Sequence, residues 1–185
     1  MQAKRFAMIP KYTFFLLFSI FLCAVCHPSI AQDDPEFTQK SITHIKLHSG
    51  MITTFHRGVD GYAVGAQLVQ QWGIVPNKLR LGAIAGGFYA AKKMDAQAGP
   101  TLSLRLKTFN ANPFGSAANL HLSIDHLWGT DKQKLIGGGL HIDLLNKLVL
   151  GITAHKDYEY KTWWLQTAVG LRISKIKKTA EPFNN

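Results

Sequence analysis

Three residues with chemically useful side chains stand at alternate positions near the middle of the chain: His121, Ser123 and Asp125. His141 and Asp143 repeat this spacing further along. In an extended strand, residues i, i+2 and i+4 share one face, so each set would point in one direction. Histidine, hydroxyl and carboxylate groups carry out nucleophilic hydrolysis, but they also form hydrogen-bonded networks inside proteins.

The segment His121-Leu122-Ser123 resembles the His-x-Ser motif of the outer-membrane lipid A deacylases, although Ile124 stands where that family has Asn. The resemblance covers three residues and implies a lipid A-modifying hydrolase, with His121 and Ser123 as weak catalytic candidates. If Leu122 faces lipid, His121 and Ser123 face inward, away from a lipid substrate. We therefore expect a polar network here rather than catalysis.

No metal or cofactor site is predicted. The histidine pairs His44/His48 and His121/His126 are each separated by four or five positions without a supporting ligand set. Residues i and i+4 of a strand lie about 13 Å apart, too far to share one ion.

The elements that must position these side chains are stretches in which apolar and polar residues alternate. Leu120, Leu122 and Ile124, for example, alternate with the polar set that begins at Asn119. Eight such strands are expected, at Ile42–Phe55, Gly61–Trp72, Leu79–Ala91, Gln97–Phe109, Ala118–Trp128, Leu135–Leu145, Leu148–Lys156 and Thr162–Ser174. Turn-forming residues separate them. The pattern predicts an all-β fold, a single eight-stranded antiparallel up-and-down β-barrel over residues 43–174.

Glycines punctuate the polar faces of two of these strands. Gly82 and Gly86 form one line, and Gly137 and Gly139 form another. No helix is expected after either line, so we interpret them as sites of close packing or barrel curvature rather than phosphate loops.

The composition of the two faces favours a transmembrane barrel, with leucines toward lipid and polar groups in the lumen. We expect a lumen network of Arg80, Arg105, His121, Asp125, His141, Asp143 and Arg172. Aromatic residues gather at strand ends, where interfacial girdles lie: Phe55, Trp72, Phe88, Tyr89, Phe109, Trp128, Tyr158, Tyr160 and Trp163. The alternative is a soluble, exported, lipocalin-like carrier whose leucines surround an apolar ligand.

The first 31 residues have the features of a secretory signal peptide. A basic flank precedes the apolar stretch Tyr12–Val25, and Ser29 and Ala31 occupy the −3 and −1 positions of a cleavage site. The 14-residue apolar core is shorter than the ~20 residues that span a bilayer. We therefore expect cleavage after Ala31, an N-terminal periplasmic tail at 32–42, the barrel at 43–174 and a basic C-terminal tail at 175–185. Both cysteines, Cys23 and Cys26, fall in the removed segment.

Charge indicates an anionic partner. Removal of the signal peptide lowers the formal net charge from +10 to +7, because Lys4, Arg5 and Lys11 are lost. Export argues against nucleic acid and leaves outer-membrane lipid and lipopolysaccharide as the expected partners. With the N-terminus in the periplasm, one set of lysines falls on the outer rim, near lipopolysaccharide phosphates: Lys92, Lys93, Lys132, Lys134, Lys156 and Lys161.

Taken together, the export signal, the cysteine-free mature chain and glycine-rich strands such as Ile136-Gly137-Gly138-Gly139-Leu140 resemble small outer-membrane β-barrel proteins of Gram-negative, Bacteroidetes-like bacteria. The resemblance covers the whole mature chain and implies a non-enzymatic barrel of the cell outer membrane, with a structural or interaction role. Such barrels often end on an aromatic residue at the end of the last strand. Here Lys175-Ile176-Lys177-Lys178 follows the last strand instead.

Overall fold

The computed structural model describes residues 39–55, 58–109, 118–144 and 147–174. Backbone contacts divide the chain into Met1–Ala31 and Gln32–Asn185, and all described residues belong to the second unit. The predicted signal peptide, residues 32–38 of the predicted N-terminal tail and the C-terminal tail at 175–185 lie outside the described residues. Within the described part, no helix is long and apolar enough to cross a membrane.

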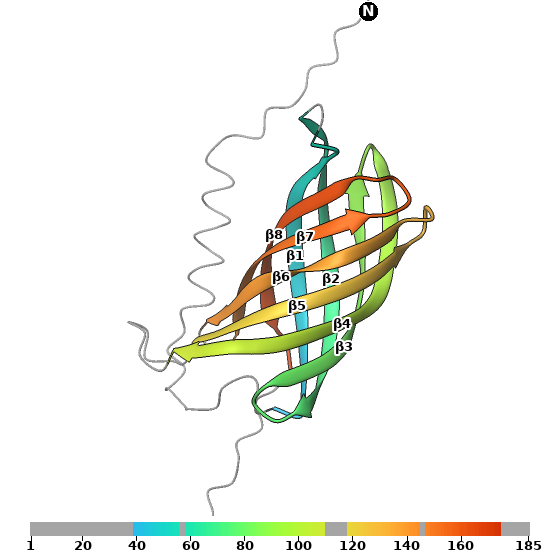
Figure 1. Cartoon of the computed structure of the whole chain (residues 1–185). Helices are drawn as coiled ribbons and strands as arrows, with labels where there is room; N and C mark the ends of the chain where they lie inside the picture. Colours follow the sequence, from blue (N-terminus) through green and yellow to red (C-terminus); the bar gives the residue numbers. More distant parts are fainter. Residues whose placement is uncertain (1–38, 56–57, 110–117, 145–146, 175–185) are drawn as a thin grey trace, which may run out of the picture. The chain divides into compact units, whose positions relative to one another are not determined.

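Eight antiparallel strands form a closed barrel (Figure 1). They are β1 (Ser41–Thr53), β2 (Val59–Val75), β3 (Leu79–Ala90), β4 (Lys93–Phe109), β5 (Ala118–Gly129), β6 (Lys134–Leu144), β7 (Leu148–Asp157) and β8 (Trp163–Arg172). Each strand pairs with its neighbours in sequence, and β8 returns to pair with β1. The predicted all-β, eight-stranded up-and-down barrel is therefore confirmed.

Most strand ends differ from the expected ones by one or two residues, and the end of β2 and the start of β4 differ by more. β4 begins at Lys93 rather than Gln97, because Lys93–Ala96 pair with Gly87–Ala90 of β3. Only Ala91 and Lys92 connect the two strands, with φ values of 48° and 66°. Two successive residues with positive φ are typical of the type I′ hairpin turn. β1 begins at Ser41, so the last two residues of the predicted N-terminal tail belong to the barrel.

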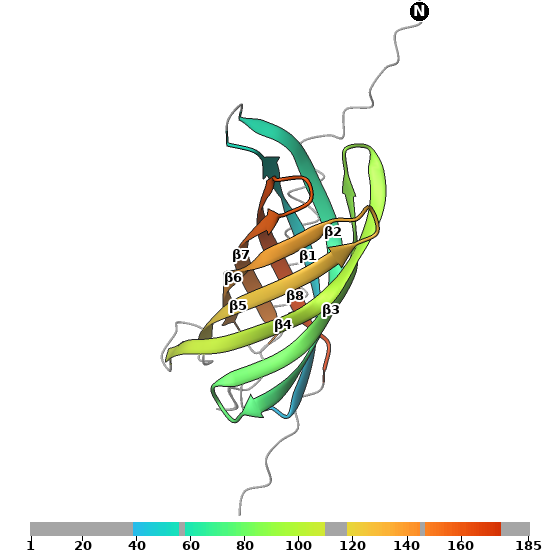
Figure 2. The ribbon, with the colours of Figure 1, turned by 45° about the vertical axis from the view of Figure 1, so that its right-hand side comes forward.

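The two ends of the barrel are distinguished here by the turns and strand ends that they contain. We call the end with the turns after β1, β3, β5 and β7 the hairpin end, and it lies in the upper part of Figure 2. The opposite end, where β1 begins and β8 ends, is called the terminal end.

Side-chain burial alternates along the strands with a period of two. In β5, His121, Ser123 and Asp125 are buried, whereas Leu122 and Ile124 are 38% and 56% exposed. The same alternation in β1 buries Lys46 and His48 and exposes Leu47 to 59%. Polar groups thus fill most of the interior and apolar groups cover the exterior, as the composition of the two faces predicted.

One part of the interior is apolar. Near the hairpin end a cluster, here called the apolar plug, fills the barrel with Ala63, Val69, Ile84, Phe88, Ala90, Leu127, Leu135 and Trp164. The rings of Phe88 and Trp164 meet edge to face, with their centroids 5.0 Å apart. The expectation that Phe88 belongs to an interfacial girdle is wrong. Tyr89 takes the outward position in β3, so the period of two turns Phe88 inward.

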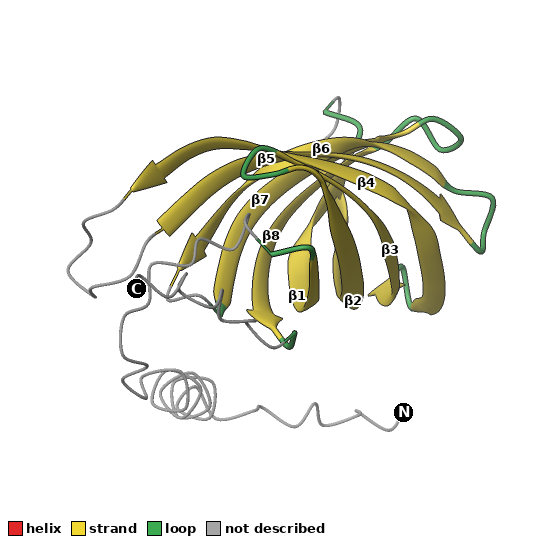
Figure 3. Cartoon of the chain, turned by 90° about the horizontal axis from the view of Figure 1, so that it is seen from below, coloured by secondary structure: helices red, strands yellow, loops and turns green. Residues whose placement is uncertain are grey.

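The predicted glycine lines lie where neighbouring strands approach closely. A Cβ atom added to Gly82, Gly86, Gly137 or Gly139 would lie 2.0–2.3 Å from a backbone oxygen of the adjacent strand. Real Cβ atoms essentially never come this close, so any other residue would force the adjacent strand to shift. These glycines therefore permit the strong bending of the strands seen in Figure 3.

Candidate functional site

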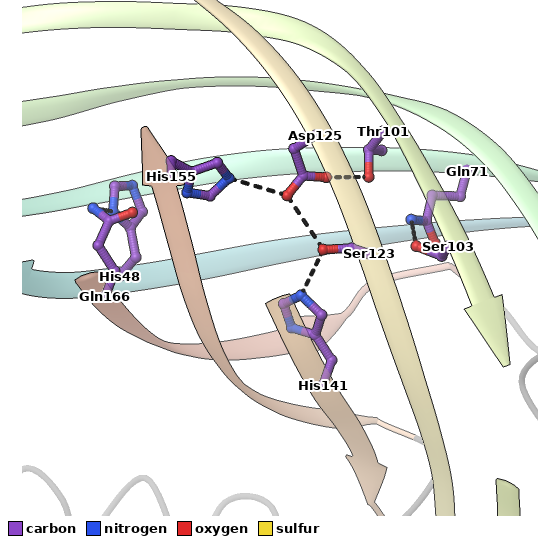
Figure 4. A network of polar contacts seen from close by, with 9 residues as sticks. All are labelled: His48, Gln71, Thr101, Ser103, Ser123, Asp125, His141, His155 and Gln166. Atoms are coloured by element: carbon purple, nitrogen blue, oxygen red, sulfur yellow. Dashed lines mark hydrogen bonds and ion pairs between the residues drawn. The ribbon is translucent and has the colours of Figure 1, made fainter. Parts of the chain in front are cut away.

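Asp125 is the centre of the polar network in the barrel interior (Figure 4). Its carboxylate accepts hydrogen bonds from Thr101 Oγ1 at 2.5 Å and from Ser123 Oγ at 3.2 Å. His155 Nε2 lies 3.2 Å from the same carboxylate. These groups come from β4, β5 and β7, so the network fastens three strands to one buried acid.

Ser123 also contacts His141 on β6, with 3.1 Å between Oγ and Nε2. Because the hydroxyl of Ser123 donates to Asp125, its oxygen can accept a hydrogen bond from an Nε2–H of His141. Within the described residues His141 Nδ1 has no hydrogen-bond partner. A hydrolytic triad needs a histidine that accepts the serine proton and a carboxylate on its other nitrogen. The contacts around Ser123 are therefore those of a polar network, not of an activated nucleophile.

The weak catalytic candidates His121 and Ser123 both face the interior, but they are not joined to each other. His121 Nδ1 lies 3.2 Å from Asp143 Oδ2, and the His121 ring stacks on His141 with centroids 5.1 Å apart. The structure thus brings Ser123 to His141 and His121 to Asp143. Both side chains lie on the opposite face of β5 from Leu122, which faces outward.

The three predicted lumen arginines lie toward the terminal end. Arg80 is fully buried and donates from Nη2 to the carbonyl oxygen of Gln39 at 2.7 Å. Arg172 donates from Nε to Ser174 Oγ at 3.2 Å. Arg105 is half-buried and lies opposite His121 in the β4–β5 register.

Several interior polar residues were not assigned to the lumen network from the sequence. Gln71 donates to Ser103 at 2.7 Å, and the side chains of Gln166 and His48 lie 2.9 Å apart. Lys46 is also buried in the interior. The alternating pattern could have identified them, because each stands on the polar face of its strand. Figure 4 shows four of them, Gln71, Ser103, His48 and Gln166.

Little space is left in the polar interior. A cavity of about 20 Å³ lies among Ser123, Asp125, His141 and His155. This is room for about one water molecule. Among residues 39–55, 58–109, 118–144 and 147–174, no group of three or more His, Cys, Asp or Glu side chains could hold a metal ion.

All six lysines of the predicted rim lie at the hairpin end, in its turns or at the adjoining strand ends: Lys92, Lys93, Lys132, Lys134, Lys156 and Lys161. Lys156 Nζ donates to the carbonyl oxygen of Lys161 at 2.9 Å and lies 5.3 Å from the centroid of the Trp163 ring. The Lys93–Asp131 ion pair is 3.9 Å long and exposed. The ammonium groups of Lys156 and Lys93 thus have partners within the hairpin end.

A tyrosine in the β7–β8 turn links this turn to the β5–β6 turn. Tyr160 donates its hydroxyl to the carbonyl oxygen of Asp131 at 2.8 Å. Desolvation and the negative charges of Asp131 and Asp157 raise the pKa of Tyr160 above its ordinary value. The phenol therefore stays protonated and can keep donating this bond.

No protein-family model matches the chain, and no curated protein sequence matches it. Two solved structures of designed proteins are similar in fold. One, from the de novo design of transmembrane β-barrels, has a TM-score of 0.47 and 11% identity, covering 77% of this chain and 100% of the design. The other, a solution NMR structure of the designed protein TMB2.3, has a TM-score of 0.47 and 12% identity, covering 73% of this chain and 96% of the design.

Proposed function

We propose that this chain is a small, non-enzymatic integral β-barrel of a Gram-negative outer membrane, with a structural or interaction role in the envelope. The observation that carries the proposal is the reversed polarity of the barrel. Ile152 and Leu47 are 61% and 59% exposed on the outside, whereas Arg80, Ser103 and Asp157 are fully buried. In water this distribution is unfavourable, because apolar area is solvated and charges are buried.

A bilayer makes the same distribution favourable. The apolar exterior contacts lipid, and ring closure leaves no strand edge with unpaired backbone groups in hydrocarbon. The competing reading, a soluble carrier of an apolar ligand, needs an apolar cavity inside the barrel. The polar middle of the barrel has room for about one water molecule, so no such cavity exists there.

The experiment that tests insertion is fractionation of the expressed full chain, followed by gel electrophoresis of unheated and boiled samples in detergent. We expect the protein in the carbonate-resistant membrane fraction, with faster migration before boiling. Mass spectrometry of the membrane form should find Gln32 at its N-terminus, as cleavage after Ala31 requires. Soluble protein without detergent would overturn the proposal.

The rim lysines suggest the partner. Six ammonium groups around the hairpin end can neutralise lipopolysaccharide phosphates if this end faces the cell exterior. Each lysine near an anionic lipid surface contributes about 1 kcal/mol.

A charge-matched pair of triple variants tests this partner. Lys92, Lys132 and Lys161 are exposed at the hairpin end, and Lys40, Lys78 and Lys147 are exposed at the terminal end. Replacing the first three with Gln should weaken lipopolysaccharide binding about a hundredfold in calorimetry of the detergent-folded barrel. Replacing the second three removes the same charge and should have little effect. Equal losses in both variants would indicate non-specific attraction only.

A further inference from the structure

The hairpin end holds a pocket of about 300 Å³ inside the ring of lysines. Its apolar wall is made by Ile52, Phe88 and Trp164, which belong to the apolar plug or pack against it. Its polar wall includes Asp95, Asp131 and Asp157. The volume is at the lower limit for small-molecule sites, and such sites combine apolar walls with a few polar groups.

Two buried residues of the pocket wall have a hydrogen-bonding atom that nothing in the described residues satisfies. Asp157 Oδ1 accepts the backbone N–H groups of Glu159 and Tyr160 at 3.0 and 3.2 Å, but Asp157 Oδ2 has no partner. Trp164 Nε1 has none either. Both residues line the pocket, with 0% and 2% of their surface exposed. A buried acceptor left in this state is unfavourable, and an ammonium group can satisfy it at Asp157 Oδ2. Trp164 Nε1–H is itself a donor, which an ammonium cannot satisfy, so Trp164 offers such a ligand its ring face only.

The charges of the lining favour a cation. Three aspartates line the pocket against a single lysine, Lys93, which lies 3.9 Å from Asp131. The other rim lysines are absent from the lining. A bare metal ion does not fit, since the described residues contain no cluster of three or more His, Cys, Asp or Glu able to coordinate one. An organic cation fits both the carboxylates and the aromatic wall.

We propose that this pocket binds a small organic cation, a primary ammonium on an apolar and preferably aromatic body. The ammonium group donates to Asp157 Oδ2, and the body packs against Phe88 and Trp164. This inference goes beyond the envelope role proposed above and does not depend on lipopolysaccharide binding, because its contacts lie inside the barrel mouth.

The four tryptophans of the chain provide a direct readout. In ¹⁵N-labelled protein folded in detergent micelles, each gives one indole N–H signal, and the Trp164→Phe variant identifies that of Trp164. The probes are 2-phenylethylammonium, neutral 2-phenylethanol and anionic 3-phenylpropionate. We expect a saturable shift of the Trp164 signal with the ammonium and at least tenfold weaker binding of the other two. The signals of Trp72 and Trp128, both on the exterior, should not move.

A matched pair of variants tests the role of the carboxylate. Asp60 Oδ2 accepts the backbone N–H of Thr54 in the β1–β2 turn and lies outside the pocket lining. Asp157→Asn should weaken binding of 2-phenylethylammonium at least tenfold, and Asp60→Asn should leave it unchanged. An Asp157→Asn variant that binds normally would overturn the proposal. So would a Trp164 signal that is insensitive to all three probes or responds to them equally. The probe series uses the unmodified chain, so it decides the question even if Asp157→Asn does not fold.

Discussion

Asp125 accepts hydrogen bonds from Thr101 and Ser123 and contacts His155, so its carboxylate is shared by donors of three strands. All four residues are buried, and the adjoining cavity has room for about one water molecule. Solvent therefore cannot replace the carboxylate if it is removed.

We expect Asp125→Ala to lower the free energy of unfolding by about 3 kcal/mol, because it leaves several buried donors unsatisfied. Urea unfolding of the barrel in lipid or detergent measures this change. The control is Asp131→Ala, which removes an aspartate with a side chain 53% exposed in a 3.9 Å ion pair. Such pairs contribute about 0–1 kcal/mol. If the two variants were equally stable, Asp125 would have no organising role.

At this scale the sequence predicted the facing of residues better than their partners. Alternation alone assigned His121, Ser123 and Asp125 to one face, and the structure buries all three. It could not predict that Ser123 contacts His141 while His121 contacts Asp143, because cross-strand pairs depend on register. Asp157 and Trp164 were not identified as site residues either, since their pocket forms only when the turns of several hairpins meet.

The strands themselves depend on glycine where the barrel bends. At Gly137 of β6, a Cβ atom would lie 2.0 Å from the backbone oxygen of Ala154 and 2.6 Å from His155 Cα. Neither atom belongs to a flexible side chain, so β7 would have to move. At Gly61 of β2, nothing lies within 4 Å of the added atom.

We expect Gly137→Ala to lower the free energy of unfolding by about 2–3 kcal/mol through overpacking. Gly61→Ala should be neutral or slightly stabilising, because it reduces the freedom of the unfolded chain without a clash. Denaturant titration of both variants under identical conditions compares them. Equal stability of the two would mean that bending does not require glycine at position 137.

Periodicity predicted these elements well because each strand has one apolar and one polar side. The errors lie where the inner face is itself apolar. Phe88 stands inside the barrel beside Trp164, and a pattern that equates the inner face with polarity places it outside. The start of β4 was placed too late because Lys93–Ala96 read as a turn, whereas pairing with β3 makes them a strand.

For the molecule as a whole, the solvent of the outer surface decides which substitutions are tolerated. Ile152 stands near the middle of β7 and is 61% exposed, and Met94 stands near the hairpin end of β4 and is 73% exposed. In water both are ordinary surface positions. In a bilayer they lie at different depths.

We expect Ile152→Arg to lower the free energy of unfolding in lipid vesicles by about 2–4 kcal/mol, and Met94→Arg by about 0–1 kcal/mol. The depth dependence is the informative quantity, because desolvation of a guanidinium is most costly at the bilayer centre. Similar small effects at both positions would indicate an aqueous exterior and would contradict the proposed membrane location.

Ring closure has a consequence for the synthesis and the truncation of the chain. The pairing of β1 with β8 joins positions far apart in sequence, such as His44 and Arg172, which are 128 residues apart. Until the last strand is present, β1 and the newest strand each expose an unpaired edge, which can pair with another chain. A product that stops before Trp163 is therefore an open sheet prone to aggregation, not a slightly smaller barrel. The cell must protect the whole length of the chain until its final strand arrives.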